Sequence, residues 1–273
     1  MDIIYAQEVA IEAAKEAGTL LRRGVKERKV ISRKSSVVDL LTEHDQAAES
    51  IILERLKEAF PNHRLITEES ALDDKRSDNS TFTWYIDPLD GTNNFTHGYP
   101  VFCSSIALFE NGQPAIGVVY DPMRDECFLA AAGQGAYLNS ANGNKRLRVS
   151  QTRELVDSLL ATGFPYDRHT SNDDNLAQHG AFLKKALGVR RSGSAALDLA
   201  YVAAGRLDGF WEYRLSSWDV AAGVCIIQEA GGTVSGIEGD HWRISPQVSL
   251  IASNGRIHSA MISVLAKVTE QFE

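Results

Sequence analysis

The sequence predicts a mixed α/β fold of the α+β kind, in which an antiparallel half is followed by an alternating half. Apolar residues recur at helical spacing near the N-terminus. After residue 95, short apolar runs are separated by tight-turn signals, which is typical of an antiparallel sheet. From about residue 149, strand-like and helix-like segments alternate. Because no linker or internal repeat is evident, we expect a single unit over residues 1–273, with halves at about 1–148 and 149–273.

The first part of the chain is expected to be mainly helical. Thr42 followed by Asp45 resembles a capping box at the start of the second helix, and Pro61 ends that helix. Helices are expected at residues 3 to about 25 and 42–60, and strands at residues 30–34 and 65–67. A polar surface loop is expected at residues 73–80.

The β region that follows is defined by its turns. Asn111-Gly112 is a strong hairpin signal, and Asp121-Pro122 and Asn142-Gly143 mark further turns. The strands around these turns are expected at residues 102–109, 115–120, 127–131 and 136–139.

The second half alternates between strands and helices, and glycine after a helix, as at Gly205 and Gly231, indicates where two of the helices end. Strands are expected at residues 159–162, 189–191, 209–212, 233–234 and 250–253. Helices are expected at residues 173–187, 195–204, 218–230 and 257 to about 272.

The composition excludes several classes of protein. The formal net charge of −8 gives no general electrostatic attraction to nucleic acid. The three cysteines form no C-x-x-C pair, so neither a zinc site nor a disulfide framework is indicated. Charged residues interrupt the N-terminus, and no apolar run is long enough to span a bilayer, so we expect a cytoplasmic protein without membrane contact.

The stretch from Thr83 to Phe95, TWYIDPLDGTNNF, has the strongest chemical pattern. Its apolar start predicts a short buried strand that ends at two carboxylates, Asp87 and Asp90. Gly91 permits a tight turn, after which backbone N–H groups can bind an anion. Acidic side chains would repel an anion bound at this turn unless cations bridge the carboxylates and the anion. The pattern therefore points to a magnesium-dependent phosphatase that acts on a small phosphomonoester.

Two more acids fit the same pattern. Glu68 follows a predicted strand, and Asp219 begins a predicted helix, in positions where layered α/β proteins gather their ligands. Carboxylate oxygens prefer magnesium or manganese to zinc, so a cluster with Asp87 and Asp90 would bind those ions and clamp a phosphate.

Each of these residues also has a structural explanation. Asp87 and Asp90 could shape a turn, although a turn does not need both carboxylates. An acid in the first turn of a helix is common, so Asp219 taken alone favours a structural role. Taken singly, Thr42 with Asp45 would be a helix cap, and so would Gly193 with Ser194. Glu68 with Glu69 would be a solvated pair in a loop. Lys34 would be a surface lysine, and Glu212 would be a charge on an edge strand.

Two long motifs make the sequence resemble the inositol monophosphatase family of lithium-sensitive, metal-dependent phosphatases. A W-x-I-D-P-[IL]-D-G-T-x-N-[FY] string occupies residues 84–95, and W-D-x-A-A-G followed by E-A-G-G occupies residues 218–223 and 229–232. Shorter similarities lie at Lys34-Ser35-Ser36, Asp39-Leu40 with Thr42 and Asp45, Thr67-Glu68-Glu69-Ser70 and Gly193-Ser194-Ala195-Ala196. The resemblance covers nearly the whole chain.

The resemblance implies a layered α-β-α-β-α sandwich, usually a homodimer, that uses two or three Mg²⁺ ions, with Mn²⁺ as a possible substitute. The implied metal ligands are Glu68, Asp87, the Leu89 carbonyl, Asp90 and Asp219. The implied phosphate and substrate contacts are Leu89, Asp90, Gly91, Thr92, Arg190, Gly193, Ser194, Ala195, Glu212 and Asp219. Residues 213–217 vary within the family, and Tyr213-Arg214 matches no pattern that we can assign to one substrate.

The implied reaction is attack by a metal-activated water without a covalent intermediate. Glu68 would orient the water, and Thr92 paired with Asp45 would help to remove its proton. The expected substrate is a small phosphorylated polyol such as inositol 1-phosphate. Fructose 1,6-bisphosphate, NADP or 3′-phosphoadenosine phosphate are alternatives. A regulatory protein that keeps this fold and contacts the transcription machinery is an alternative from another class.

Overall fold

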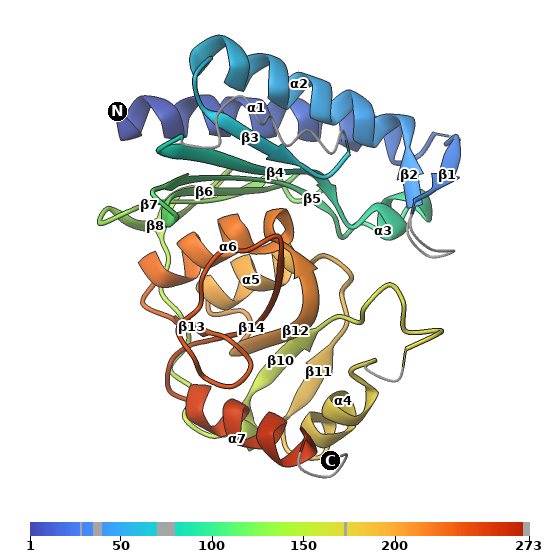
Figure 1. Cartoon of the computed structure of the whole chain (residues 1–273), viewed down its shortest axis with the longest axis vertical. Coiled ribbons are helices and arrows are strands. Elements are labelled where there is room, and N and C mark those ends of the chain that lie inside the picture. Colours follow the sequence, from blue (N-terminus) through green and yellow to red (C-terminus); the bar gives the residue numbers. More distant parts are fainter. Residues whose placement is uncertain (28, 35–39, 70–79, 172–173, 270–273) are drawn as a thin grey trace.

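The computed structural model describes residues 1–27, 29–34, 40–69, 80–171 and 174–269. Their helices and sheets form alternating α, β, α, β and α layers, which confirms the expected sandwich (Figure 1). Several predicted features lie outside the described residues, namely those at Ser35, Ser36, Asp39, Ser70, residues 73–79, Asp173 and residues 270–272. Within the described part of the chain, no helix has the length and apolarity needed to cross a membrane.

The first outer layer pairs α1 (Ile3–Gly24) with α2 (Glu43–Ala59). Small side chains let α1 lie close to the sheet, since its buried face consists mainly of alanines. The capping box at the start of α2 is confirmed: the Asp45 carboxylate accepts from the Thr42 N–H at 2.7 Å. A small antiparallel pair, β1 (Ile31–Arg33) and β2 (Leu40–Thr42), leads into this helix.

The large sheet has seven strands in the order β3-β4-β5-β6-β7-β8-β9. The β3 and β4 strands are parallel, and every later neighbour is antiparallel, as expected. Asn111 and Gly112 both have positive φ, 50° and 76°, as a two-residue hairpin turn requires. The strands are β3 (Arg64–Thr67), β4 (Phe82–Asp90), β5 (Cys103–Glu110), β6 (Gln113–Asp121), β7 (Glu126–Ala131), β8 (Gly135–Ser140) and β9 (Gly143–Arg146). The last of them was not expected from the sequence.

The β4 strand does not end where the sequence predicts. It continues through Pro88 to Asp90, and its pairing with β5 shifts register between Asp87 and Asp90. A bulge tolerates a residue without an N–H, so Pro88 interrupts the ladder without ending the strand. The bulge thereby places both carboxylates at one edge of the sheet, directly before the short helix α3 (Thr92–Thr96).

The second half contains the middle helices, the small sheet and the last helix layer. The small sheet has the order β11-β10-β12-β14-β13, with β10 parallel to both of its neighbours. Its strands are β10 (Leu159–Thr162), β11 (Gly188–Arg190), β12 (Gly209–Ser216), β13 (Thr233–Ser235) and β14 (Gln247–Ser253). Helices α5 (Ala195–Ala203) and α6 (Ser217–Glu229) lie between the sheets, and α4 (Leu176–Leu183) and α7 (His258–Thr269) cover the outer face, with a 3₁₀ turn at η2 (Leu155–Asp157).

Two elements of this half differ from their predicted bounds. The α4 helix is shorter than residues 173–187, because Asn175 before it adopts φ 67° and its side chain binds Thr162, Gly163 and Trp211. The β12 strand is longer than residues 209–212, because a bulge lets it continue to Ser216.

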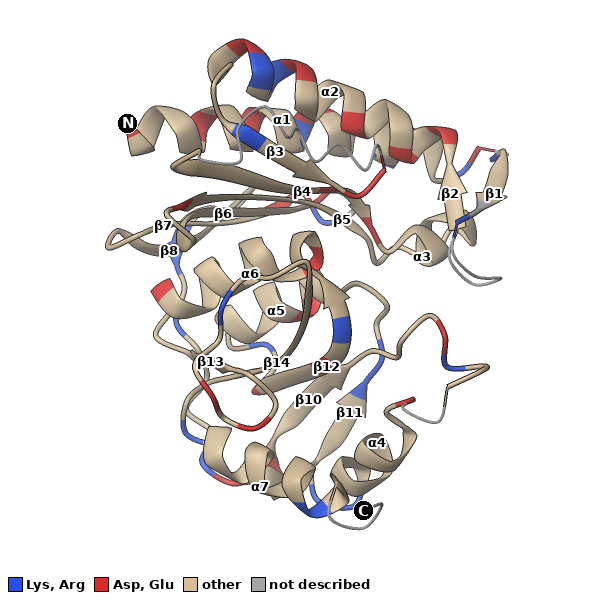
Figure 2. Cartoon of the chain, in the orientation of Figure 1, with Lys and Arg blue, Asp and Glu red and all other residues tan. Residues whose placement is uncertain are grey.

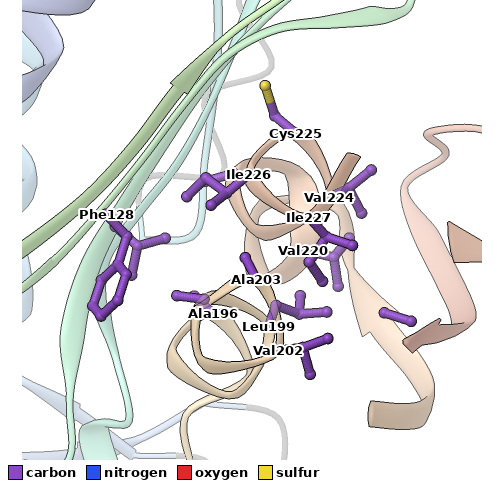
Figure 3. Close-up of a cluster of buried hydrophobic side chains, with 14 of the residues drawn as sticks. Phe128, Ala196, Leu199, Val202, Ala203, Val220, Val224, Cys225, Ile226 and Ile227 are labelled. Atoms are coloured by element: carbon purple, nitrogen blue, oxygen red, sulfur yellow. The ribbon is translucent and has the colours of Figure 1, made fainter. Parts of the chain in front are cut away.

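Three buried apolar clusters fill the spaces between the layers. The largest draws on the large sheet, on α5 and α6 and on the small sheet, so it joins the two halves of the chain. In Figure 3, Ile226 of α6 and Ala196 of α5 lie toward the sheet strand that contains Phe128, whereas Val224 and Val202 lie on the opposite side of these helices. The site described below lies at the edge of this shared core.

Candidate active site

A pocket lies where the carboxyl end of β4 meets the N-terminal ends of α5 and α6. Figure 2 shows acidic residues on both sides of this junction. The pocket is lined by the end of β3, the turn at the start of α3, the loop after β10, the loop before α5 and the bulged part of β12. It is therefore built from both halves of the chain.

The four acids expected from the sequence all line this pocket. Glu68 and Asp87 come together because β3 and β4 are parallel neighbours and end at the same edge. Asp90 follows the bulge, and Asp219 sits in the first turn of α6, where its carboxylate also accepts from the Ser216 N–H at 2.7 Å. Asp219 therefore caps α6 and also lines the pocket.

Burial and mutual repulsion dominate the electrostatics of this cluster. Burial, with the charge of Glu68 next, raises the pKa values of Asp87 and Asp219 well above the ordinary range. Burial also raises the pKa of Asp90 to about 6, while hydrogen bonds from Ser194 and Ala196 oppose that rise. Bringing such carboxylates together costs free energy that bound cations would recover.

The donor set fits a hard divalent cation. Carboxylates and the Leu89 carbonyl are oxygen ligands of the type that Mg²⁺ and Mn²⁺ prefer. Among the residues that the structure describes, no three acidic, His or Cys side chains already surround one ion-sized point. Glu68 is directed toward Lys34, whose ammonium nitrogen lies 2.9 Å from the Glu68 carboxylate.

Asp90 also joins the two halves of the molecule. Its Oδ2 accepts from the Ser194 hydroxyl and from the Ala196 N–H, both at 2.7 Å. Beside it, the Asn94 side chain donates to the Ser192 carbonyl at 2.8 Å. The β4–α3 turn and the start of α5, about a hundred residues apart in sequence, are therefore held together.

The turn at Gly91 can be made only by glycine. Its φ is 98°, and a Cβ there would lie 2.9 Å from the Val101 carbonyl oxygen. The N–H groups of Gly91 and Thr92 lie at the first turn of α3, where helical N–H groups have no acceptor within the helix. They are thus suited to bind oxygens of a phosphate.

Thr92 and Asp45 form the pair that the sequence resemblance implied. The Thr92 hydroxyl donates to Asp45 Oδ1 at 3.0 Å, and a second contact to the Leu89 carbonyl measures 3.1 Å. Asp45 is buried, and burial raises its pKa. Asp45 is therefore both the N-terminal cap of α2 and a partner of a pocket hydroxyl.

The remaining wall of the pocket contains acids and an arginine. Glu212 is buried against Gly163, where a Cβ would lie 2.0 Å from its carboxylate, so a larger residue there would displace the Glu212 side chain. Burial raises the pKa of Glu212 to about 8, and the charge of Arg191 opposes that rise. Asp198, which the sequence did not suggest, also lines the pocket.

Arg190, predicted to contact substrate, does not line the pocket; Arg191 does. Arg190 is the last residue of the edge strand β11, and its side chain extends beside Gly188 on that strand. Consecutive side chains of an extended segment point in opposite directions, so the two arginines face different surroundings. Gly193, Ser194 and Ala195 do line the pocket, as expected.

Lys34 contacts the pocket acid Glu68, and the sequence did not reveal this environment. Taken alone it resembled a surface lysine, but it lies between Glu68 and Glu69, with its ammonium group 2.9 and 2.6 Å from their carboxylates. The neighbouring motif residues were the one signal that pointed to it. The loop after β10 and Arg214 were likewise missed, because no local pattern marks them.

Comparisons with known proteins agree with this geometry. The model of the inositol monophosphatase family matches residues 5–270. The chain is 43% identical to an inositol-1-monophosphatase of Synechocystis, over 97% of this chain and 90% of that protein. It is 42% identical to the Nus factor SuhB of Pseudomonas aeruginosa, over 94% of each.

A solved structure shows the same fold. The inositol monophosphatase of Anabaena (Nostoc) superimposes with a TM-score of 0.87 at 41% identity, covering 98% of this chain and 97% of that one. Because the family model and the relatives span nearly the whole chain, this protein belongs to the inositol monophosphatase family.

Proposed function

We propose that this phosphatase hydrolyses myo-inositol monophosphate, such as inositol 1-phosphate, to inositol and phosphate in a magnesium-dependent reaction. The main support is one observation: four carboxylates from separate elements line the same pocket as the Gly91–Thr92 turn. The name of the Synechocystis relative supports the choice of substrate. The buried carboxyl of Glu212 supports a polyol, since it can bond to a hydroxyl of the ring.

The metal ligands in this proposal are Glu68, Asp87, the Leu89 carbonyl, Asp90 and Asp219. Two or three Mg²⁺ ions, or Mn²⁺ in their place, would neutralise phosphate charge and activate a water. Among the described residues, six acids but two arginines line this pocket, and Lys34 lies beside Glu68. A dianionic phosphate would be repelled without such ions.

The protein groups would divide the remaining work. The N–H groups of Gly91 and Thr92 hold phosphate oxygens, and Glu68 orients the attacking water. The Thr92 hydroxyl donates to Asp45 Oδ1, so a water bound at the Thr92 oxygen would pass its proton to that oxygen as Thr92 gives its own to Asp45. The Gly193–Ala195 backbone and Glu212 position the polyol.

A substrate panel tests this proposal. We expect hydrolysis of inositol 1-phosphate to require Mg²⁺, to be inhibited by lithium, and to exceed hydrolysis of fructose 1,6-bisphosphate, NADP and 3′-phosphoadenosine phosphate. Asp90→Asn keeps the shape of the side chain but removes a charge from the cluster, and kcat should fall by at least about 10²-fold. Unchanged magnesium-dependent turnover by this variant, with its fold intact by circular dichroism, would contradict the assignment.

A regulatory role is the second candidate, favoured by the 42% identity to a protein named Nus factor SuhB. In that case the chain would bind a component of the transcription machinery, with or without catalysis. Pull-down with purified RNA polymerase and Nus factors, using wild type and Asp90→Asn, tests it. Retention by both proteins would support a second role, and retention by neither would argue against it. The homodimer and the cytoplasmic location stay predictions.

A further inference from the structure

Arg214 occupies an irregular position in the pocket wall. The pairing of β12 with β14 shifts register between Glu212 and Leu215, and Arg214 lies within this bulge. Its φ is 56°, in the left-handed region, and its N–H donates to the Ser249 hydroxyl at 3.0 Å. A bulge redirects the side chain of the extra residue, and here Arg214 lines the pocket.

Asp167 neutralises this arginine. The two guanidinium NH₂ groups of Arg214 donate to the two carboxylate oxygens of Asp167 at 2.8 and 2.9 Å. Asp167 belongs to the loop after β10, and Gly163 to Tyr166 of that loop line the same pocket. The ion pair therefore joins the bulge of β12 to this loop. The Arg214 side chain is 26% exposed, so substrate can reach it.

The other guanidinium that lines the pocket belongs to Arg191. Arg191 lies close enough to Asp198 and Glu212 for its charge to oppose the rise of their pKa values. By contrast, the Arg214–Asp167 pair offers hydrogen bonds without net positive charge on its side of the pocket. An uncharged polyol ring fits this side better than a second phosphoryl group does.

We propose that Asp167, by occupying the guanidinium of Arg214, makes the pocket select a monophosphate with an uncharged ring over a bisphosphorylated substrate. A guanidinium binds carboxylate and phosphate in the same bidentate geometry, so the two compete for Arg214. With the negative charge of Asp167 removed, Arg214 becomes available to a second phosphoryl group. This inference rests on the proposed function and adds its selectivity.

Asp167→Asn is the variant that tests it, because the substitution removes the charge and keeps the shape. The measurement is kcat and KM for inositol 1-phosphate and fructose 1,6-bisphosphate at fixed Mg²⁺. We expect the ratio of kcat/KM, bisphosphate over monophosphate, to rise about tenfold, as expected for one uncovered charge near a phosphate. The change should lie in KM for the bisphosphate and should shrink with added salt.

Two controls separate the charge effect from a structural one. The double variant Asp167→Asn with Arg214→Gln should return the ratio to about the wild-type value, since the guanidinium is gone. Asp157→Asn removes the same charge from an exposed site away from the pocket and should leave the ratio unchanged. A merely structural role of Asp167 would change both substrates alike.

The outcomes are distinguishable. An unchanged ratio in Asp167→Asn, or an equal rise in the double variant, would overturn this inference and leave the proposed phosphatase activity standing. Turnover of neither substrate by the wild type would overturn both. A rise in the single variant that Arg214→Gln reverses would establish Asp167 as a positioning residue for selectivity.

Discussion

Asp198 shows how strongly single buried carboxyls affect this protein. It lies in the first turn of α5, accepts a hydrogen bond from the Ser192 hydroxyl, and is almost fully buried. Burial raises the pKa of Asp198 to about 8 from 3.8. The folded protein therefore holds a proton on Asp198 at pH values where the unfolded chain has already lost it.

This shift predicts the pH dependence of stability. Between about pH 4 and 8 the folded state binds more protons than the unfolded state, so the free energy of unfolding falls as pH rises through that window. Asp198→Asn removes this contribution. The free energy of unfolding of the variant minus that of wild type should be larger at about pH 8 than at about pH 5. Urea unfolding with a chelator present measures both proteins at each pH. Parallel pH profiles for the two proteins would contradict the assignment.

At the scale of elements, close approach between α6 and the large sheet positions Asp219. A Cβ on Gly117 of β6 would lie 2.5 Å from the Ala222 carbonyl oxygen of α6, and backbone atoms cannot rotate away. Gly117→Ala should destabilise the protein by about 1–3 kcal/mol through overpacking. It should also lower phosphatase kcat, because α6 contains Asp219.

Gly180 offers the matched control. It lies in α4 with nothing within 4 Å of a Cβ, so Gly180→Ala should gain up to about 1 kcal/mol from helix propensity. Urea unfolding of both variants measures the difference. Equal stability of Gly117→Ala and wild type would show that α6 can move away from the sheet without cost.

At the scale of the whole molecule, the cluster of acids lies at the junction of the two halves. Asp90 receives hydrogen bonds from α5, and Asp219 comes from α6, whereas Glu68 and Asp87 belong to the large-sheet half. Ions bound between them would bind the folded protein and not the unfolded chain. At a Mg²⁺ concentration a hundred times its Kd, binding should therefore add about 2.7 kcal/mol to the free energy of unfolding, and Tm should rise accordingly.

Differential scanning calorimetry with Mg²⁺, with EDTA and with NaCl of equal ionic strength measures this effect. NaCl should not reproduce the rise in Tm, and Asp90→Asn should reduce it. A Tm that responds neither to chelator nor to Mg²⁺ would remove the basis for a metal site between the halves.

The elements of this protein could be predicted well where their signals are local. The α2 capping box at Thr42, the Asn111-Gly112 hairpin and the glycine after α5 each depend on a few neighbouring residues. The β9 strand and the full length of β12 were missed, because pairing with a neighbour decides them rather than composition. Glu68, Asp87, Asp90 and Asp219 were found as candidates because each directly borders a predicted strand or helix.

By itself, the sequence determined the mixed helix and strand character of the fold, most of its helices and strands, and the four acids Glu68, Asp87, Asp90 and Asp219, because periodicity, caps and turn residues act over short distances. Only the tertiary structure decided which of Arg190 and Arg191 faces the pocket, how β4 passes Pro88, and that Arg214 meets Asp167. These features depend on strand register and on contacts between residues far apart in the chain, for which no local pattern exists.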